Sequence, residues 1–393
     1  MYRIINSIDR KGTIPVVISS PGEAEEQLVD ILHVTQNEKN KATQMIAKEF
    51  SCLSYWQQQY QAINPSMTFR ATTFRDYEVW QNNFREKYLE CLGKMPADDQ
   101  PLNVKIVDQF ENEHYLRKKI VYTADSYSKI PAYLFIPKGV QFPGPAIICP
   151  HGHGRGKVDP AGIAETETDQ DHINQYNYNY AEQFAMQGYV TLAPDLRCFG
   201  ERVDDPDEVY GQVKIVEGDH WCDVNFVLGM LIGYNLLTLH VFDIGRGIDL
   251  LQSLTEVNGD RIGCVGLSLG GTNTLFSTAF HQRIKVAAIS GYFNSWKAFP
   301  MDSGQICGSQ IVPNLLSYGD HVEVAGLISP RPLFLEFGEQ DPIFPITASR
   351  ASYLRLKELY KVAGASDKLV LEEFPGVHQF KGNRVFDFFN DWL

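Results

Sequence analysis

The chain has 393 residues, a net charge of −13 at pH 7 and an apolar fraction of 44%. Its length exceeds one typical domain, and its apolar content is sufficient for a large core, which excludes a disordered chain. The negative charge excludes nucleic acid or an anionic membrane surface as the main partner, because both require clustered Lys and Arg.

Cysteine usage and the first residues indicate the compartment. Seven cysteines lie without paired spacing, several in apolar runs, so buried reduced thiols in a reducing compartment are expected. Residues 1–17 contain charges and no uninterrupted apolar stretch, so no secretory signal is expected. The apolar run 226–237 is too short to span a bilayer. These features predict a cytoplasmic protein without a membrane partner, and homo-oligomerisation stays open.

Residues 1–112 are predicted to form a helical extension that shapes access to the functional site. Ser20 begins a capping box, and a second helix covers residues 46–60. A third helix is predicted to start at Thr73 and to end at Gly93. Its apolar face carries Tyr77, Trp80, Phe84 and Tyr88. Packing explains these aromatic residues most simply, although one that faces a substrate is an open alternative.

Residues 113–393 are predicted to form an α/β domain, because strand patterns alternate with helix patterns. The predicted strands are 119–124, 132–136, 145–150, 189–194, 261–265, 286–290, 332–337 and 368–374. The predicted helices are 178–188, 236–254 and 386–393. This alternation favours a mostly parallel sheet with helices on both faces.

The most informative stretch is GLSLG at 266–270, which directly follows the apolar run 261–265. It predicts a buried strand, a sharp turn at Ser268 and a helix after the turn. The flanking glycines lack Cβ atoms, so the turn can tighten until the Ser268 hydroxyl stands clear of the backbone. A hydroxyl in that position can attack a carbonyl group. A glycine-serine turn without chemistry explains these five residues equally well.

A candidate acid and a candidate base follow further along the chain. Asp341 comes after the strand 332–337, and His378 comes after the strand 368–374. A serine nucleophile needs a base that takes its proton and a third group that orients the base. The order serine, acid, histidine is a known order for such triads, and each residue follows a strand, where open α/β sheets bind ligands.

Simpler roles exist for both partners of the serine. His378 could be an ordinary loop histidine, and Asp341 could be a turn residue ahead of Pro342. Three other acids compete for the role of Asp341: Glu336, Glu339 and Asp195. Ser268, Asp341 and His378 occur in the order of a triad, and each of them follows a strand. This combined pattern favours a triad over three unrelated simpler roles.

The motif HGHG at 151–154 follows the strand that ends at Pro150. Such a turn can supply an oxyanion donor through the backbone N–H of His153 or its neighbour, opposite the N–H of Leu269. Two histidines one residue apart also raise the question of a metal. Because no Cys, Asp or third His stands at the usual spacing, the loop role is favoured and no metal is predicted.

A polar segment, DLRCFGER at 195–202, follows another predicted strand. Arg197 either meets an anionic substrate or forms an internal salt bridge to a nearby acid, and the salt bridge is favoured. Cys198 has no separate base that would make it a nucleophile. The acidic residues within 201–208 predict a solvated loop.

These segments together resemble the α/β-hydrolase superfamily, and most closely its dienelactone-hydrolase and acetylxylan-esterase-like branch. The segments that carry the resemblance are HGHG at 151–154, DLRCFGER at 195–202, GDRIGCVGLSLGG at 259–271, SPRPLFLEFGEQDPIFP at 329–345 and PGVHQF at 375–380. The resemblance begins near residue 115 and implies an α/β-hydrolase fold and a carboxylester hydrolase without a cofactor. It implies Ser268 as nucleophile, Asp341 as acid and His378 as base. Cys198 departs from the family, whose members usually have glycine in this turn.

The predicted reaction is hydrolysis of a small-molecule ester with a short acyl group, including acetylated carbohydrates, through an acyl-enzyme on Ser268. The alternatives are a serine peptidase of the prolyl-oligopeptidase type, a carbon–carbon bond hydrolase, and a hydrolase-like protein that only binds a ligand or partner. The helical extension and the loop 291–320 are expected to line the pocket. Individual substrate-binding residues are not predicted.

Overall fold

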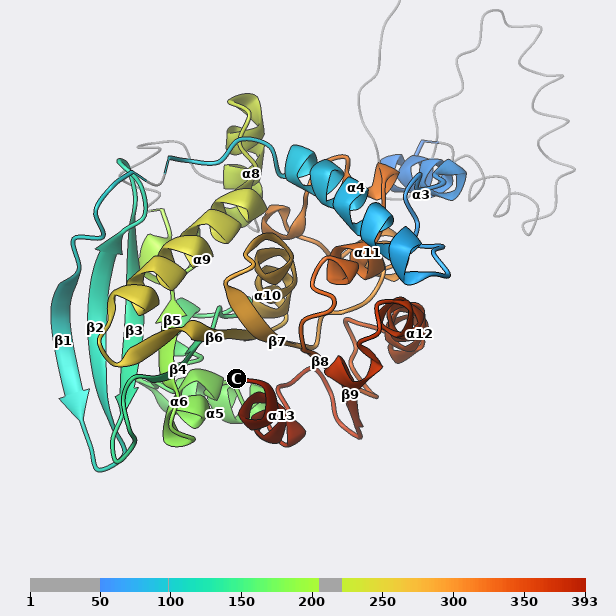
Figure 1. Ribbon diagram of the computed structural model, residues 1–393. Helices are drawn as coiled ribbons and strands as arrows, with labels where there is room; N and C mark the ends of the chain where they lie inside the picture. The colour runs from blue at the N-terminus through green and yellow to red at the C-terminus, as the bar shows by residue number, and fades with distance from the viewer. Residues whose placement is uncertain (1–49, 98, 205–220) are drawn as a thin grey trace, which may run out of the picture. The chain divides into compact units, whose positions relative to one another are not determined.

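The computed structural model describes residues 50–97, 99–204 and 221–393 (Figure 1). The predicted capping box at Ser20 lies outside these ranges. The chain divides into two compact units, Met1–Gln59 and Tyr60–Leu393. The described part of the first unit holds most of α3 (Cys52–Ala62). The sheet, the cavity and the candidate site all belong to the second unit.

The described strands form one sheet of nine strands in the order β1-β2-β3-β5-β4-β6-β7-β8-β9 (Figure 1). The strands are β1 (Lys105–Glu111), β2 (Tyr115–Thr123), β3 (Lys129–Pro137), β4 (Gly144–Ile148), β5 (Val190–Pro194), β6 (Val257–Leu267), β7 (Ile284–Ser290), β8 (Leu333–Gly338) and β9 (Leu369–Phe374). The first three strands and β5 pair antiparallel, and all pairs from β5 to β9 are parallel. The predicted, mostly parallel α/β sheet is confirmed.

Helices cover both faces of this sheet. The described α-helices of the second unit, not all of which touch the sheet, are α4 (Phe74–Leu92), α5 (Glu167–Tyr176), α6 (Tyr180–Met186), α8 (Trp221–Leu231), α9 (Leu236–Ser253), α10 (Leu269–Phe280), α11 (His321–Gly326), α12 (Ile346–Val362) and α13 (Arg384–Trp392). In Figure 1, α9 and α10 lie on one face, and α6 and α13 lie on the other. Successive residues of β4 point to opposite faces of the sheet and pack in different hydrophobic clusters. Ile147 packs with α6 and α13, and Ile148 packs with α9. Both strand faces are therefore buried, which explains the continuous apolar runs.

Helix α4 has the predicted boundaries but is part of the main core. The Thr73 side chain accepts the Asp76 backbone N–H at its start, and Gly93, with φ 72°, ends it. Its buried side chains are Tyr77, Phe84, Tyr88 and Leu92, which pack in one cluster with residues of β7, β8, α10 and α12. The compact unit therefore starts near Tyr60 and not at the expected boundary after residue 112.

The expectation of helix throughout residues 1–112 is wrong for β1, which pairs with β2 along residues 105–111. Every residue of β1 is exposed, so the strand has no alternation of buried and exposed positions that would predict it. The sequence interpretation also missed α12, whose buried residues are spaced along a mostly polar segment.

Within the described ranges, no single helix has both the length and the apolar content to cross a membrane. Helices α8 and α9 satisfy the length and composition test only as a pair, and they are bent by 99° at the break between them. All seven cysteines are free thiols, and five of them are buried.

Candidate active site

Ser268 occupies a sharp turn between β6 and α10. Its backbone has φ 60° and ψ −120°, a conformation that costs a non-glycine residue about 1–3 kcal/mol. A Cβ on Gly266 would lie 2.4 Å from the backbone of Gly270, and one on Gly270 would lie 2.2 Å from the carbonyl oxygen of Pro150. The turn therefore closes this tightly only with glycine at both positions. The backbone N–H of Ser268 donates to Ser290 O at 3.0 Å and ties the turn to β7.

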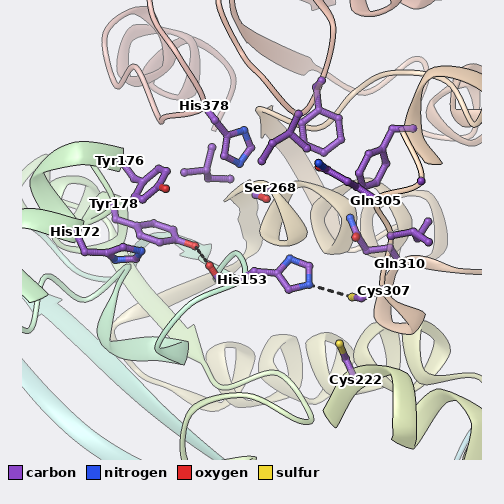
Figure 2. Close-up of a pocket in the computed structure, with 16 residues that line it drawn as sticks. His153, His172, Tyr176, Tyr178, Cys222, Ser268, Gln305, Cys307, Gln310 and His378 are labelled. Atoms are coloured by element: carbon purple, nitrogen blue, oxygen red, sulfur yellow. Dashed lines mark hydrogen bonds between the residues drawn. The ribbon is translucent and has the colours of Figure 1, made fainter. Parts of the chain in front are cut away.

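A cavity of about 480 Å³ opens beside this turn, and both Ser268 and His378 face it (Figure 2). Its lining residues are His153, His172, Tyr176, Tyr178, Cys222, Leu267, Ser268, Phe299, Gly304, Gln305, Ile306, Cys307, Gln310, Ile343, Phe344 and His378. Residues from the loop 291–320 are present, as expected. No lining residue comes from the segments 60–97 and 99–112, whereas α5 and α8 both contribute.

His378 is held in one orientation by Asp341. Nδ1 of His378 lies 2.8 Å from Oδ2 of Asp341, and the two side chains are only 9% and 3% exposed. The ring of Phe344 stacks on the imidazole with centroids 5.6 Å apart, and the ring of Tyr176 meets it edge-on. Gly291, with φ 52°, leaves the space, because a Cβ there would lie 3.1 Å from the imidazole.

The competing acids lie in other environments. Glu339 is half exposed and is 3.8 Å from the guanidinium of Arg350. Asp195 is buried and forms an ion pair with Lys157 Nζ at 2.7 Å, while it also accepts the backbone N–H of Glu201. Among the acids weighed from the sequence, Asp341 is the one that contacts His378.

Glu336 supports the same region from within β8. One carboxylate oxygen accepts the Ser290 hydroxyl at 2.7 Å and the Lys381 N–H at 3.0 Å, and the other accepts the Gly382 N–H. The carboxyl thereby joins the end of β7 to the segment that follows His378. Its complete burial raises its pKa to about 7, although these hydrogen bonds favour the ionised form.

The loop 151–154 packs directly against the turn at Ser268. A Cβ on Gly152 would lie 3.3 Å from Ser268 Cβ and 2.3 Å from the Tyr178 hydroxyl, so the approach requires glycine. His151 is fully buried: its Nε2 accepts the Leu196 N–H at 3.0 Å, so Nδ1 carries the proton and donates to Gly152 O at 2.7 Å. Burial lowers the pKa of His151, which keeps this imidazole neutral. His151 is therefore a structural residue of the loop.

The two expected oxyanion donors belong to segments that adjoin Ser268. Leu269 is the first residue of α10, where backbone N–H groups have no partner within the helix. His153 belongs to the loop that packs on Ser268, and its imidazole points along the cavity wall, away from His378 (Figure 2).

The imidazole of His153 meets two thiols that the sequence interpretation did not connect with it. Its Nε2 lies 3.0 Å from Cys307 Sγ, and Cys222 Sγ completes a group whose three atoms lie within 4.8 Å of one another. The neighbouring Cys222 thiol is the main reason that the pKa of Cys307 is lowered; His153 lowers this pKa further, while burial raises it. The same contact, together with burial, raises the pKa of Cys222. Within the residues that the structure describes, these three side chains form a group that could hold a metal ion.

Arg197 and Cys198 have structural environments. The guanidinium of Arg197 donates to Asp243 at 2.8 and 2.9 Å and to Asp125 at 2.9 Å, so its salt bridges are internal but involve acids outside its own segment. Cys198 has φ 72°, which explains why glycine suits this position. Burial raises the pKa of Cys198 to about 12, so its thiol is not a nucleophile at neutral pH. Glu201, expected in a solvated loop, pairs with Lys119 at 2.9 Å, and residues 205–208 lie outside the described ranges.

Comparison with known proteins agrees with this architecture. The chain is 26% identical over 286 residues to a Bacillus subtilis (strain 168) protein named "Putative hydrolase YtaP", across 72% of this chain and 89% of that one. The solved structures that share the fold include two named as esterases. A "putative acetyl xylan esterase" of Bacteroides fragilis NCTC 9343 has a TM-score of 0.67 at 16% identity, with 83% of this chain and 82% of that chain covered. A glucuronoyl esterase from Solibacter usitatus has a TM-score of 0.56 at 14% identity, with 80% and 93% covered.

A family model described as the Abhydrolase family matches residues 11–287, well over half of the chain. The matched range includes the loop 151–154 and the turn at Ser268, and it ends before β8 and β9. The family match therefore gives no information on Asp341 and His378, whose pairing is known only from the distances described above. The sharp turn between β6 and α10, the sheet order and the family match agree, and the chain belongs to the Abhydrolase family of α/β-hydrolases.

Proposed function

We propose that this protein is a carboxylic ester hydrolase that works through an acyl-enzyme on Ser268. One observation carries the proposal: Ser268 and His378 face the same cavity, while Nδ1 of His378 is bonded to Asp341 at 2.8 Å. That bond keeps the proton on Nδ1, so Nε2 of His378 has a free lone pair with which to accept a proton.

In the proposed reaction, Nε2 of His378 takes the proton of the Ser268 hydroxyl as the oxygen attacks the ester carbonyl. The backbone N–H groups of Leu269 and His153 stabilise the oxyanion, and each such donor is typically worth about 10²–10³ in rate. His378 then protonates the leaving alcohol, and water releases the acid by the reverse sequence. Asp341 stabilises the imidazolium in both halves.

The cavity supports a neutral, small ester as the substrate. None of its lining residues, all in the described part of the chain, is Asp, Glu, Lys or Arg. Aromatic rings from Tyr176, Tyr178, Phe299 and Phe344 form much of the wall, and such rings pack on the apolar faces of sugars and aryl groups. The neighbours named as acetyl xylan esterase and glucuronoyl esterase support a short-acyl ester of a carbohydrate as the substrate class.

Ser268→Ala tests the proposal. Hydrolysis of p-nitrophenyl acetate should fall by about 10⁴–10⁶-fold in kcat, because removal of a serine nucleophile abolishes the covalent route. A fluorophosphonate probe should label the wild type and not the variant. Ser253→Ala, a serine on α9 outside the cavity lining, is the matched control and should keep both properties.

Full esterase activity in a correctly folded Ser268→Ala variant would contradict the proposal. A substrate panel of acetylated sugars, aryl esters, lactones and peptides then identifies the class. Release of amines from peptides with esters untouched would favour a peptidase instead.

A further inference from the structure

The proposed ester chemistry uses the backbone N–H of His153 but none of the clustered side chains of His153, Cys222 and Cys307. The three side chains come from three separate elements: the loop 151–154, the first turn of α8 and the loop that follows residue 304. All three line the cavity, and Figure 2 shows the Cys222 thiol and the His153 imidazole facing Cys307.

We propose that His153 Nε2, Cys222 Sγ and Cys307 Sγ form a binding site for a thiophilic d¹⁰ metal ion, with Zn²⁺ as the reference ion. The ligand set of two sulfurs and one nitrogen is one that zinc uses with an open fourth position. Because all three residues line the cavity, water or a ligand can approach such an ion from the cavity.

The distances suit this coordination. In a tetrahedral site with zinc–sulfur and zinc–nitrogen bonds of about 2.3 and 2.0 Å, ligand atoms are separated by about 3.5–3.8 Å. The three ligand atoms lie within 4.8 Å of one another, and Nε2 lies 3.0 Å from Cys307 Sγ. Each pair therefore needs to move by no more than about 1 Å to reach ideal separations.

The packing between α8 and the loop around residue 308 holds the two thiols together. The Gly308 N–H donates to Asp223 Oδ1 at 2.7 Å, directly beside both cysteines. A Cβ on Gly308 would lie 2.2 Å from Phe226 Cβ, so loop and helix are in close contact. Ser309 Oγ lies 2.6 Å from Cys307 Sγ and supplies a further polar neighbour. The residues Cys222 and Cys307 are only 4% and 7% exposed, and both line the cavity, so an ion would reach them from the cavity.

Titration of the reduced, untagged full-length chain with Co²⁺ tests the site directly. The wild type should bind one equivalent and show a thiolate-to-cobalt charge-transfer band in the near ultraviolet, with the intense visible absorption of tetrahedral cobalt. One equivalent of Zn²⁺ should remove both signals. A spectrum without charge transfer would overturn the proposal.

Competition with a chromophoric chelator then measures zinc affinity in variants. Cys222→Ser and Cys307→Ser should each weaken binding by more than about 100-fold, because outer-shell changes alone typically cost 10–100-fold. Cys198→Ser, a buried thiol in the same apolar cluster, is the matched control and should bind as the wild type. Ser268→Ala should also bind normally, which separates this proposal from the proposed ester hydrolysis.

Unchanged zinc binding in both serine variants would overturn the site. If the serine variants fail to fold, X-ray absorption spectroscopy of the zinc-loaded wild type decides: a shell with two sulfurs and one imidazole nitrogen supports the site. A shell made only of nitrogen and oxygen rejects it.

Discussion

Nδ1 of His378 lies 2.8 Å from Oδ2 of Asp341, while Oδ1 of the same carboxylate accepts the backbone N–H groups of Ile343 and Phe344. One oxygen therefore orients the imidazole, and the other shapes the turn that carries the carboxylate. Phe344, which belongs to that turn, also stacks on His378. The turn 341–344 therefore holds the His378 imidazole both by its hydrogen bond to Asp341 and by the stacked ring of Phe344.

Asp341→Asn should lower kcat for p-nitrophenyl acetate by about 10⁴-fold and change KM little, because an amide NH₂ facing Nδ1 favours the wrong imidazole tautomer. The asparagine oxygen can still accept from Ile343 and Phe344, so the turn should persist. Steady-state kinetics measures the effect, and circular dichroism checks the fold.

Glu339→Gln is the control for that change. Glu339 follows the same strand but is half exposed beside Arg350. Its kcat should match that of the wild type. If Glu339→Gln lost activity and Asp341→Asn kept it, the assignment of the acid would have to be exchanged.

Gly270→Ala should destabilise the protein by about 1–3 kcal/mol, because the new methyl group would lie 2.2 Å from the carbonyl oxygen of Pro150. The sign of the change in the free energy of unfolding is informative. Helix propensity alone predicts that alanine in place of glycine within α10 stabilises the protein by about 1 kcal/mol. Urea denaturation measures the change. Gly144→Ala, whose methyl group would have its nearest neighbour at 3.5 Å, should have little effect. Equal stability of both variants would refute the close packing of the turn.

Glu336 should make stability depend on pH. Burial raises its pKa from 4.5 to about 7 in the folded protein, so the folded state holds this proton more tightly than the unfolded state. Protonated Glu336 makes its full contribution to the free energy of unfolding below pH 4.5, and this contribution is lost as the pH rises through 7. Between pH 5 and 8, the free energy of unfolding of the wild type should fall on the order of 2 kcal/mol more than that of Glu336→Gln.

Urea denaturation at pH 5, 6, 7 and 8 checks this difference in slope. The comparison uses slopes because the glutamine amide cannot accept every hydrogen bond that Glu336 accepts, so absolute stabilities also change. Glu372, the cross-strand neighbour of Glu336 in β9, raises the same pKa. Parallel pH profiles for the two proteins would show that Glu336 stays ionised in the fold.

Much of the architecture could be predicted from local sequence patterns. Buried parallel strands need continuous apolar runs, and α4 begins at Thr73 and ends at Gly93 because capping is a property of adjacent residues. The turn at Ser268 was recognisable for the same reason, since GLSLG contains Gly266 and Gly270, which allow the turn to close on itself and on Pro150. Exposed β1 had no comparable signal, and it was missed.

Local patterns in the amino-acid sequence were enough to predict the strands from β2 to β9, the sharp turn at Ser268 and the order in which a serine, acids and a histidine follow strands. Which acid contacts His378 could not be predicted in this way, because Asp341 and Glu339 follow the same strand and differ only in the direction that the folded turn gives each side chain. The tertiary structure decided this contact and also that His153 meets Cys222 and Cys307. Contacts between residues so far apart in the chain leave no local pattern, since packing of α8 against a distant loop creates them.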